Sequence, residues 1–347
     1  MFTQMNTFYL RWLKKLLPFK AFYNDWLDCS GMINETGEDH TLNLPIDFFT
    51  NLKFDNISLR QYRIDAAIHC AEALGNKPAL CLSGGIDSQA MVQCWKEAEL
   101  DFDVIILTFK NNLNVQDSNH AKLYCEKNNI KYIEIEFDII SFLTRENMDI
   151  GEKYRLCSPH FTTHYKLAEI LFSKGYTGVC YGGATPYNHL EEYGFNFSQN
   201  PFHFLKVSSK FEGIFQGSFL SFYPQLAWSI AFLTDKFVED VIVNKEHNKM
   251  RIWEDEQRMN HIRYLQKITG YQRAGLTVIP QETKYTGFEL VKKYFQDLTG
   301  DGWTFEKRFR YPLTLRFNKD MHNYKLNLNL DQQSVISSVY SNVLRTG

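Results

Sequence analysis

The residues of this chain best suited to chemistry form one short stretch, residues 81–88, with the sequence Cys-Leu-Ser-Gly-Gly-Ile-Asp-Ser. Gly84 and Gly85 let the backbone approach a ligand with no Cβ in the way. Ser83 and Ser88 place a hydroxyl donor on either side of them. Hydrogen-bond donors around an open backbone turn are suited to an anion, and phosphate is the anion that we expect here.

The sequence around this stretch predicts the geometry that an anion site needs. A short apolar run at 78–82 predicts a buried strand, and residues 89–99 predict a helix. The free N–H groups of the first helical turn and the helix dipole then attract a negatively charged ligand. Asp87 would repel a phosphate unless a cation stood between them, so its carboxylate indicates Mg²⁺. The simpler alternative is a serine-glycine turn before an ordinary helix, with Asp87 as a first-turn acid.

Residues 83–88 resemble the Ser-Gly-Gly-x-Asp-Ser motif of the PP-loop ATP pyrophosphatases. That family includes asparagine synthetases, GMP synthetases, argininosuccinate synthetases and tRNA-modifying enzymes. A Walker A motif, Gly-x4-Gly-Lys-Ser/Thr, occurs nowhere in the chain. The resemblance implies ATP and Mg²⁺ as cofactors, with Asp87 as a metal ligand and catalytic residue. It also implies that the nucleotide is held by Ser83, Gly84, Gly85, Asp87 and Ser88.

Strand and helix patterns alternate along the chain around this motif. We expect further strands at 102–109, 132–137 and 177–181, and helices at 61–74, 117–128, 138–146 and 159–174. Such alternation predicts parallel strands joined by right-handed helical crossovers. The expected fold class is therefore α/β, a Rossmann-like doubly wound parallel sheet of the HUP/PP-loop type. An N-terminal extension and a mainly helical C-terminal part complete it.

In such a sheet, ligands bind at the carboxyl ends of the strands. The strand ends at Thr108-Phe109 and Gly182-Gly183 should therefore meet the 83–88 loop in one crevice. In the PP-loop family the end of the second strand holds adenine through backbone groups, so the resemblance implies that role for Thr108 and Phe109. Asparagine synthetases also carry a glycine-rich turn after the corresponding later strand, which implies nucleotide contacts for Gly182 and Gly183.

The second acidic metal ligand of asparagine synthetases has no direct counterpart here. Where those enzymes have an Asp-Glu pair, this chain has Thr185-Pro186, and Glu191 and Glu192 follow later. The two glutamates are candidates to replace the missing ligand, and a plain turn is the alternative. His189 beside them is a candidate substrate contact, and a loop histidine without a role is the alternative.

Two late cations are candidates for a catalytic role. Cleavage at the α-phosphate of ATP builds negative charge on the departing pyrophosphate, so a Lys or Arg is expected to reach back to the phosphates. Lys284 and Arg310 are the candidates, and an exposed surface cation is the alternative for each. His160 and His164 have a four-residue spacing that can bind metal, but without a third ligand nearby a solvated or core pair is favoured.

The chain divides by pattern into an N-terminal extension (1–75), a PP-loop ATP-binding domain (76–200) and a mainly helical substrate-side region (201–347). A basic, aromatic, amphipathic segment at 8–17 predicts a helix docked on the body rather than one lying on a membrane. Asparagine synthetases begin with a glutaminase domain whose nucleophilic Cys follows the initiator Met. Phe2 stands there in this chain, so ammonia or an amine is expected from solution, a partner or the substrate.

Composition limits the partners. The 38 Lys and Arg against 40 Asp and Glu give a net charge of -2. This balance does not indicate binding to nucleic acid through bulk charge, so tRNA is a possible partner without support from the charge. Residues 213–234 carry no charge, but their polar side chains and proline favour a buried helical segment over a membrane span. Seven cysteines without a Cys-x-x-Cys pair, and no apolar leader segment, indicate a reduced, cytoplasmic protein.

Together with the resemblance, these features imply an ATP pyrophosphatase that releases AMP and pyrophosphate. It would adenylate a carboxylate or carbonyl oxygen of a small molecule or nucleotide for attack by ammonia or an amine, as an asparagine-synthetase-like ligase. Two alternatives stay open. One is a nucleotide or tRNA-base modifier of the same family, and the other is a non-catalytic ATP- or AMP-binding module.

Overall fold

The structure is a computed structural model of the 347-residue chain. It describes residues 27–28, 40–42, 44–154, 156, 158–183, 214–216, 219–230, 232, 287–317, 326–327 and 330–345.

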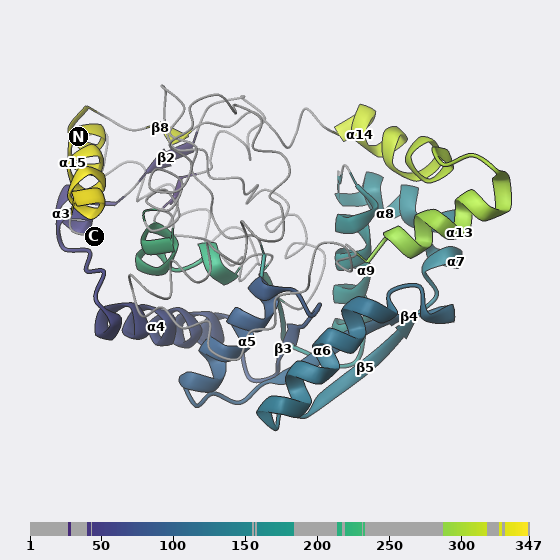
Figure 1. Ribbon diagram of the computed structural model, residues 1–347, viewed down its shortest axis with the longest axis horizontal. Helices are drawn as coiled ribbons and strands as arrows, with labels where there is room; N and C mark the ends of the chain where they lie inside the picture. The colour runs from purple at the N-terminus through teal and green to yellow at the C-terminus, as the bar shows by residue number, and fades with distance from the viewer. Residues whose placement is uncertain are drawn as a thin grey trace, which may run out of the picture.

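A five-stranded parallel sheet lies at the centre of the fold (Figure 1). Its strands are β3 (Pro78–Cys81), β4 (Asp103–Phe109), β5 (Tyr132–Phe137), β6 (Gly178–Tyr181) and β7 (Ile214–Gln216). They lie in the order β5-β4-β3-β6-β7, and every neighbouring pair is parallel. From β3 the chain adds β4 and β5 on one side of the sheet and then β6 and β7 on the other side. The direction of winding therefore reverses between β3 and β6. Doubly wound sheets bind ligands at such a reversal point. The predicted α/β, Rossmann-like, doubly wound fold is confirmed.

Helices cover both faces of this sheet because consecutive strand residues point to opposite sides. Leu80, Val104 and Ile106 pack on one face in a cluster with side chains of α4, α5 and α6. Ala79, Ile105 and Val179 pack on the other face with side chains of α7, α8, α9 and α13. The bounds are α4 (Asn56–Leu74), α5 (Ile86–Glu97), α6 (Val115–Asn128), α7 (Ile139–Arg145), α8 (Asn147–Tyr154), α9 (Pro159–Ser173) and α13 (Glu289–Thr299).

Two helices begin earlier than the sequence pattern predicts. α4 begins at Asn56, five residues before the predicted start, because the Asp55 carboxylate accepts from the N–H groups of Ile57 and Ser58 at 3.1 and 3.0 Å. α5 begins at Ile86 rather than at Gln89. Asp87 therefore lies inside the first turn of the helix and not in a loop before it.

The uncharged segment 213–234 is only partly the buried helix that was predicted. Its described part begins with strand β7 on the sheet edge, continues through the 3-10 turn η2 (Phe219–Ser221), and becomes helical at 224–230. Trp228 and Phe232 are buried there. Among the described helices, none combines the length and the apolar character needed to cross a bilayer. β7 extends the sheet beyond residue 200, and the proposed division into three parts remains a prediction.

A second, three-stranded sheet joins segments from both ends of the chain. β1 (Leu27–Asp28) runs antiparallel to β2 (His40–Leu42), which pairs in parallel with β8 (Leu326–Asn327). Helices α3 (Ile46–Thr50) and α15 (Leu330–Arg345) contact each other beside it, at the left of Figure 1. The segment η3 (Glu306–Arg310) and helix α14 (Tyr311–Phe317) lie at the opposite end of the molecule.

Candidate functional site

The loop between β3 and α5 is held in shape by its own serines. The Ser88 hydroxyl donates to the Gly85 carbonyl at 2.9 Å and accepts from the Ser83 backbone N–H at 3.2 Å. The Ser83 and Ser88 hydroxyls lie 3.1 Å apart, and the Gly85 N–H donates to the Ser83 hydroxyl at 3.4 Å. Gln89 donates from Nε2 to the Gly84 carbonyl at 2.8 Å. The loop is thus fixed before any ligand arrives.

Gly84 is required by both its conformation and its surroundings. Its φ of +81° lies in the left-handed region that side chains disfavour. A Cβ there would lie 2.4 Å from the Asp117 carbonyl oxygen and 2.9 Å from the Ala121 nitrogen. Both atoms are backbone of the first turns of α6, so the start of α6 contacts the loop directly.

Gly182 brings the end of β6 against the start of α5. A Cβ on Gly182 would lie 2.6 Å from three backbone atoms, the carbonyl carbon of Asp87 and the nitrogen and Cα of Ser88. Gly183 follows with a φ of +71°. The structure therefore brings together the loop and the Gly182-Gly183 turn, which the sequence predicted to meet.

Backbone groups at the end of β4 are already hydrogen-bonded to the Asn114 side chain. The Phe109 backbone N–H donates to Asn114 Oδ1 at 2.7 Å, and Asn114 Nδ2 donates to the Leu107 carbonyl at 2.8 Å. The Thr108 hydroxyl donates to the Ile135 carbonyl at 3.4 Å, and the Phe109 ring is buried. An adenine held by the Phe109 N–H would have to displace Asn114, so the predicted backbone contacts of Thr108 and Phe109 remain a prediction.

The start of α13 reaches the same edge of the sheet from far along the chain. A Cβ on Gly287 would lie 3.5 Å from Asp117 Oδ2, beside the start of α6. The Phe288 ring lies 5.9 Å from the Phe109 ring and 5.9 Å from the His160 ring. Phe288 itself occupies the N-cap position of α13.

Two histidines of α9 stack at the end of β6. The His160 and His164 rings are 4.4 Å apart, and His164 stacks on Tyr181 at 4.5 Å. The Tyr181 hydroxyl donates to the His164 carbonyl at 2.7 Å. Desolvation lowers the pKa of both imidazoles, more for the half-buried His164 than for the more exposed His160, and the His160 charge lowers the pKa of His164 further.

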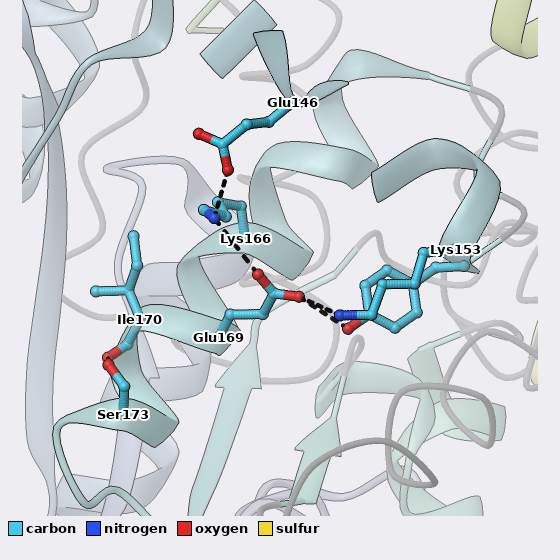
Figure 2. Close-up of polar contacts among 7 residues, drawn as sticks. Glu146, Lys153, Lys166, Glu169, Ile170 and Ser173 are labelled. Atoms are coloured by element: carbon cyan, nitrogen blue, oxygen red, sulfur yellow. Dashed lines mark hydrogen bonds and ion pairs between the residues drawn. The ribbon is translucent and has the colours of Figure 1, made fainter. Parts of the chain in front are cut away.

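A polar network fixes α9 against its neighbours, as Figure 2 shows. Glu169 Oε1 accepts from Lys153 Nζ at 2.8 Å and from the Tyr154 hydroxyl at 3.0 Å, both on α8. Lys166 Nζ lies 2.6 Å from Glu146 Oε2 and 3.6 Å from Glu169 Oε2. These contacts orient α9, and with it the two histidines near its start.

The predicted catalytic cations are not placed at the loop by the described contacts. Arg310 is exposed, and its guanidinium pairs with Glu306 Oε2 at 3.5 Å, one turn earlier in the same segment. This pairing favours the surface-cation alternative for Arg310. The other candidates lie outside the described residues: Lys284, His189, Glu191 and Glu192.

The chemistry of the loop suits Mg²⁺ only together with phosphate oxygens. Among the residues that the structure describes, no group of three or more His, Cys, Asp or Glu side chains is arranged to hold a metal ion. Mg²⁺ in nucleotide sites is bound by one or two carboxylates together with phosphates, so Asp87 in the first turn of α5 fits that pattern. Burial raises the pKa of the neighbouring Cys81 thiol to about 12, which keeps it protonated and removes it as a nucleophile.

Comparison with known proteins gives matches among solved structures. No protein-family model and no curated protein matches the sequence. Among solved structures, an NH3-dependent NAD synthetase from Campylobacter jejuni is similar at 16% sequence identity and a TM-score of 0.28. The match covers 63% of this chain and 97% of that chain.

Several site residues escape a reading of the sequence alone. Gln89, Asn114 and Asp117 lie close to the motif in sequence, but their hydrogen bonds and close contacts depend on how the strands are paired. Phe288 and Glu289 lie about 200 residues beyond the loop, and no local pattern connects them to it. Only the run Asn-Asn-Leu-Asn at 111–114, after a predicted strand, hints at a specialised turn.

Proposed function

We propose that this protein is a nucleotide-dependent ligase that splits ATP into AMP and pyrophosphate. It activates a carboxylate or carbonyl oxygen of a small molecule or nucleotide by adenylation, for attack by ammonia or an amine. The type is that of the synthetase domain of asparagine synthetases. A cytoplasmic location and a supply of ammonia or amine from solution, from a partner or from the substrate form part of the proposal.

One observation carries the proposal: the motif at 83–88 forms a preorganised loop at the switch point of a doubly wound sheet. Ser83 and Ser88 hold the loop, and Gly84 and Gly182 allow two backbone segments to close around it. The α5 N-cap, Gly85, has no side-chain hydrogen bond to the first turn. A helix start of this kind attracts an anionic ligand through its first-turn N–H groups and its dipole.

The chemistry follows from these positions. The backbone N–H groups at the start of α5 bind the outer phosphates of ATP, and Asp87 holds the Mg²⁺ that neutralises their charge. The substrate oxygen attacks the α-phosphorus, the bond to the bridging oxygen breaks, and pyrophosphate leaves. Catalysis is chiefly positioning and charge stabilisation. Lys284 and Arg310 are proposed for the charge on the departing pyrophosphate, and Glu191 or Glu192 for the second carboxylate.

The test is pyrophosphate release from ATP and Mg²⁺ in the presence of pooled amino acids, nucleosides or tRNA with ammonium chloride. We expect release with one pool, and a loss of at least about 100-fold in Asp87→Asn. Asp149→Asn is the matched control, because Asp149 is an exposed first-turn acid on α8. Tight ATP binding without release from any pool would favour the non-catalytic nucleotide-binding module instead.

A further inference from the structure

The residue pair with the clearest unassigned chemistry is His160 with Glu289. His160 lies in the first turn of α9, and its side chain is solvent-accessible. Glu289 begins α13 and is close enough for its negative charge to raise the pKa of His160 against the larger, opposite effect of burial. A histidine beside a carboxylate, accessible and neutral near pH 7, is a common arrangement for accepting a proton.

Three chains of contact connect this pair to the carboxyl edge of the sheet, where the loop at 83–88 lies. His160 contacts His164, which stacks on Tyr181, and Tyr181 precedes the Gly182 that lies against Asp87 and Ser88. His160 also contacts Phe288, which packs on Phe109 at the end of β4.

The third connection runs through α13. Gly287, two residues before Glu289, lies beside Asp117 of α6, whose backbone carbonyl adjoins Gly84. The pair therefore stands at the carboxyl edge of the sheet, on the α9 side of the proposed nucleotide site.

We propose that His160, at the carboxyl edge of the sheet beside the start of α13, accepts the proton that the attacking nitrogen loses in the second half of the reaction. This inference rests on the proposed function. The nitrogen lone pair forms a C–N bond to the activated carbon, and the C–O bond to AMP breaks, with AMP leaving as the phosphate anion. One proton of the nitrogen passes to an imidazole nitrogen of His160, and solvent removes it from the exposed ring.

The groups that face His160 favour this role. His164 on the same helix is half-buried, and desolvation holds its pKa well below the usual value, so it stays neutral and adds no positive charge. Tyr181 of β6 is buried, which raises its pKa and keeps the phenol protonated. The negative charge of Glu289 on α13 raises the pKa of His160, and the ring of the neighbouring Phe288 lies 5.9 Å from the His160 ring.

The experiment separates the two half-reactions in the full chain. Exchange of labelled pyrophosphate into ATP, without ammonium, reports adenylation. Incorporation of ¹⁵N from ¹⁵N-ammonium chloride into the same substrate pools, followed by mass spectrometry, reports nitrogen transfer. We expect His160→Gln and Glu289→Gln to keep the exchange rate within about 3-fold and to lower ¹⁵N incorporation, His160→Gln by about 100-fold or more.

A pH profile distinguishes proton transfer from a merely structural role. At constant free ammonia, the wild-type rate of ¹⁵N incorporation should fall as the pH drops through the histidine pKa, and His160→Gln should lose that limb. His69→Gln is the matched control, because His69 is an exposed histidine on α4 paired with Glu72 at 3.7 Å and lies away from the site. It should change neither rate.

The outcomes separate the inference from the function on which it rests. Exchange that depends on Asp87 combined with unchanged ¹⁵N incorporation in His160→Gln would overturn the inference and leave the proposed function standing. His120 of α6 also lies beside the loop, since its Cβ would be 3.1 Å from a Cβ on Gly84. If the acid-side fall in rate disappeared in His120→Gln instead, the proton acceptor would be on α6 and the inference would be overturned. No exchange and no incorporation from any pool would overturn both.

Discussion

Among the described helices that pack on the five-stranded sheet, those that begin with a side-chain cap and those that begin without one lie in different places. α4 and α7 begin with an aspartate whose side chain accepts from first-turn N–H groups: Asp55 from Ile57 and Ser58, and Asp138 from Ser141 at 2.9 Å. α5, α6, α9 and α13 begin at Gly85, Asn114, Ser158 and Phe288, and none of these side chains caps the helix. The uncapped group contains the helix starts that contact one another around the loop at 83–88.

The comparison teaches that local stability and ligand binding draw on the same backbone groups. A cap satisfies N–H groups that a helix cannot satisfy itself, and it typically contributes about 1 kcal/mol to stability. Asn114 has a side chain suited to capping, yet it bonds to the Phe109 N–H and the Leu107 carbonyl instead. At α5 the N-cap is Gly85, so an anionic ligand at the loop can supply the acceptor that a capping side chain supplies elsewhere, and the helix goes without the stability that such a side chain adds.

The largest expected effect comes from adding a side chain at Gly84, where the start of α6 contacts the loop before α5. Gly84→Ala places a Cβ 2.4 Å from a backbone oxygen in a left-handed conformation, so we expect a loss of about 2–5 kcal/mol in unfolding free energy. Gly175 has nearly the same φ, +84°, with nothing within 4 Å of its Cβ position. Gly175→Ala should therefore cost only the conformational term, about 1–2 kcal/mol. Urea unfolding of both variants measures the difference.

The same pair of variants also reports on the ligand. Isothermal titration with ATP and Mg²⁺ should show weakened binding for folded Gly84→Ala and unchanged binding for Gly175→Ala. Equal stability losses in the two variants would show that α6 does not press on Gly84 as described, and the contact between the two helix starts would be wrong.

The sequence predicted the part of the site that is local in the chain. The strand, the glycines and the serines at 83–88 lie within a few residues, and their conformation follows from residue type and from the pattern on either side. Gly182 could also be placed, because the carboxyl ends of parallel strands meet at one edge. The predicted start of α4 was wrong because a capping side chain, Asp55, sets the first residue of the helix.

The sequence could not predict contacts that depend on the return of distant segments. α13 places Phe288 and Glu289 beside α9 only because its apolar side chains Val291 and Phe295 pack on the sheet face that α9 also covers. The edge strand β7 was hidden in an uncharged segment, where length and hydrophobicity favour a helix. The segment forms a strand because it pairs in parallel with β6, which is a long-range contact.

A smaller effect is expected for the capped group. Asp55→Ala should lower the thermal midpoint by about 1–3 °C, while Asp55→Asn, which keeps an acceptor, should lower it less. The Ser58 N–H and hydroxyl, with the Ile57 N–H, lower the pKa of Asp55. The stabilisation is therefore present above the ordinary carboxyl pKa of about 4 and is lost as the pH falls through the lower folded value.

Thermal unfolding between pH 2 and pH 7 measures this prediction. The gap between wild type and Asp55→Ala should shrink toward acid pH, and ATP binding should be the same in both. Weaker ATP binding in Asp55→Ala would show that caps away from the loop also support the site, which would break the separation between the two groups.

The smallest expected effect tests whether α9, an uncapped helix, is stabilised by the network of Figure 2 instead. Glu169→Gln should cost at most about 1 kcal/mol, because the contacts with Lys153 and Lys166 are partly exposed. Burial alone would lower the pKa of Lys166, but hydrogen bonds and charges of Glu146 and Glu169 outweigh it and raise the pKa. The stabilisation is thus fully present below the ordinary lysine pKa of about 10.4 and is lost as the pH rises through the higher folded value.

Urea unfolding at pH 8 and pH 11 should show the difference in unfolding free energy between wild type and Glu169→Gln shrinking at the higher pH. A difference that stayed constant would mean that Glu169 acts through Tyr154 rather than through charge, and that α9 is held chiefly by packing.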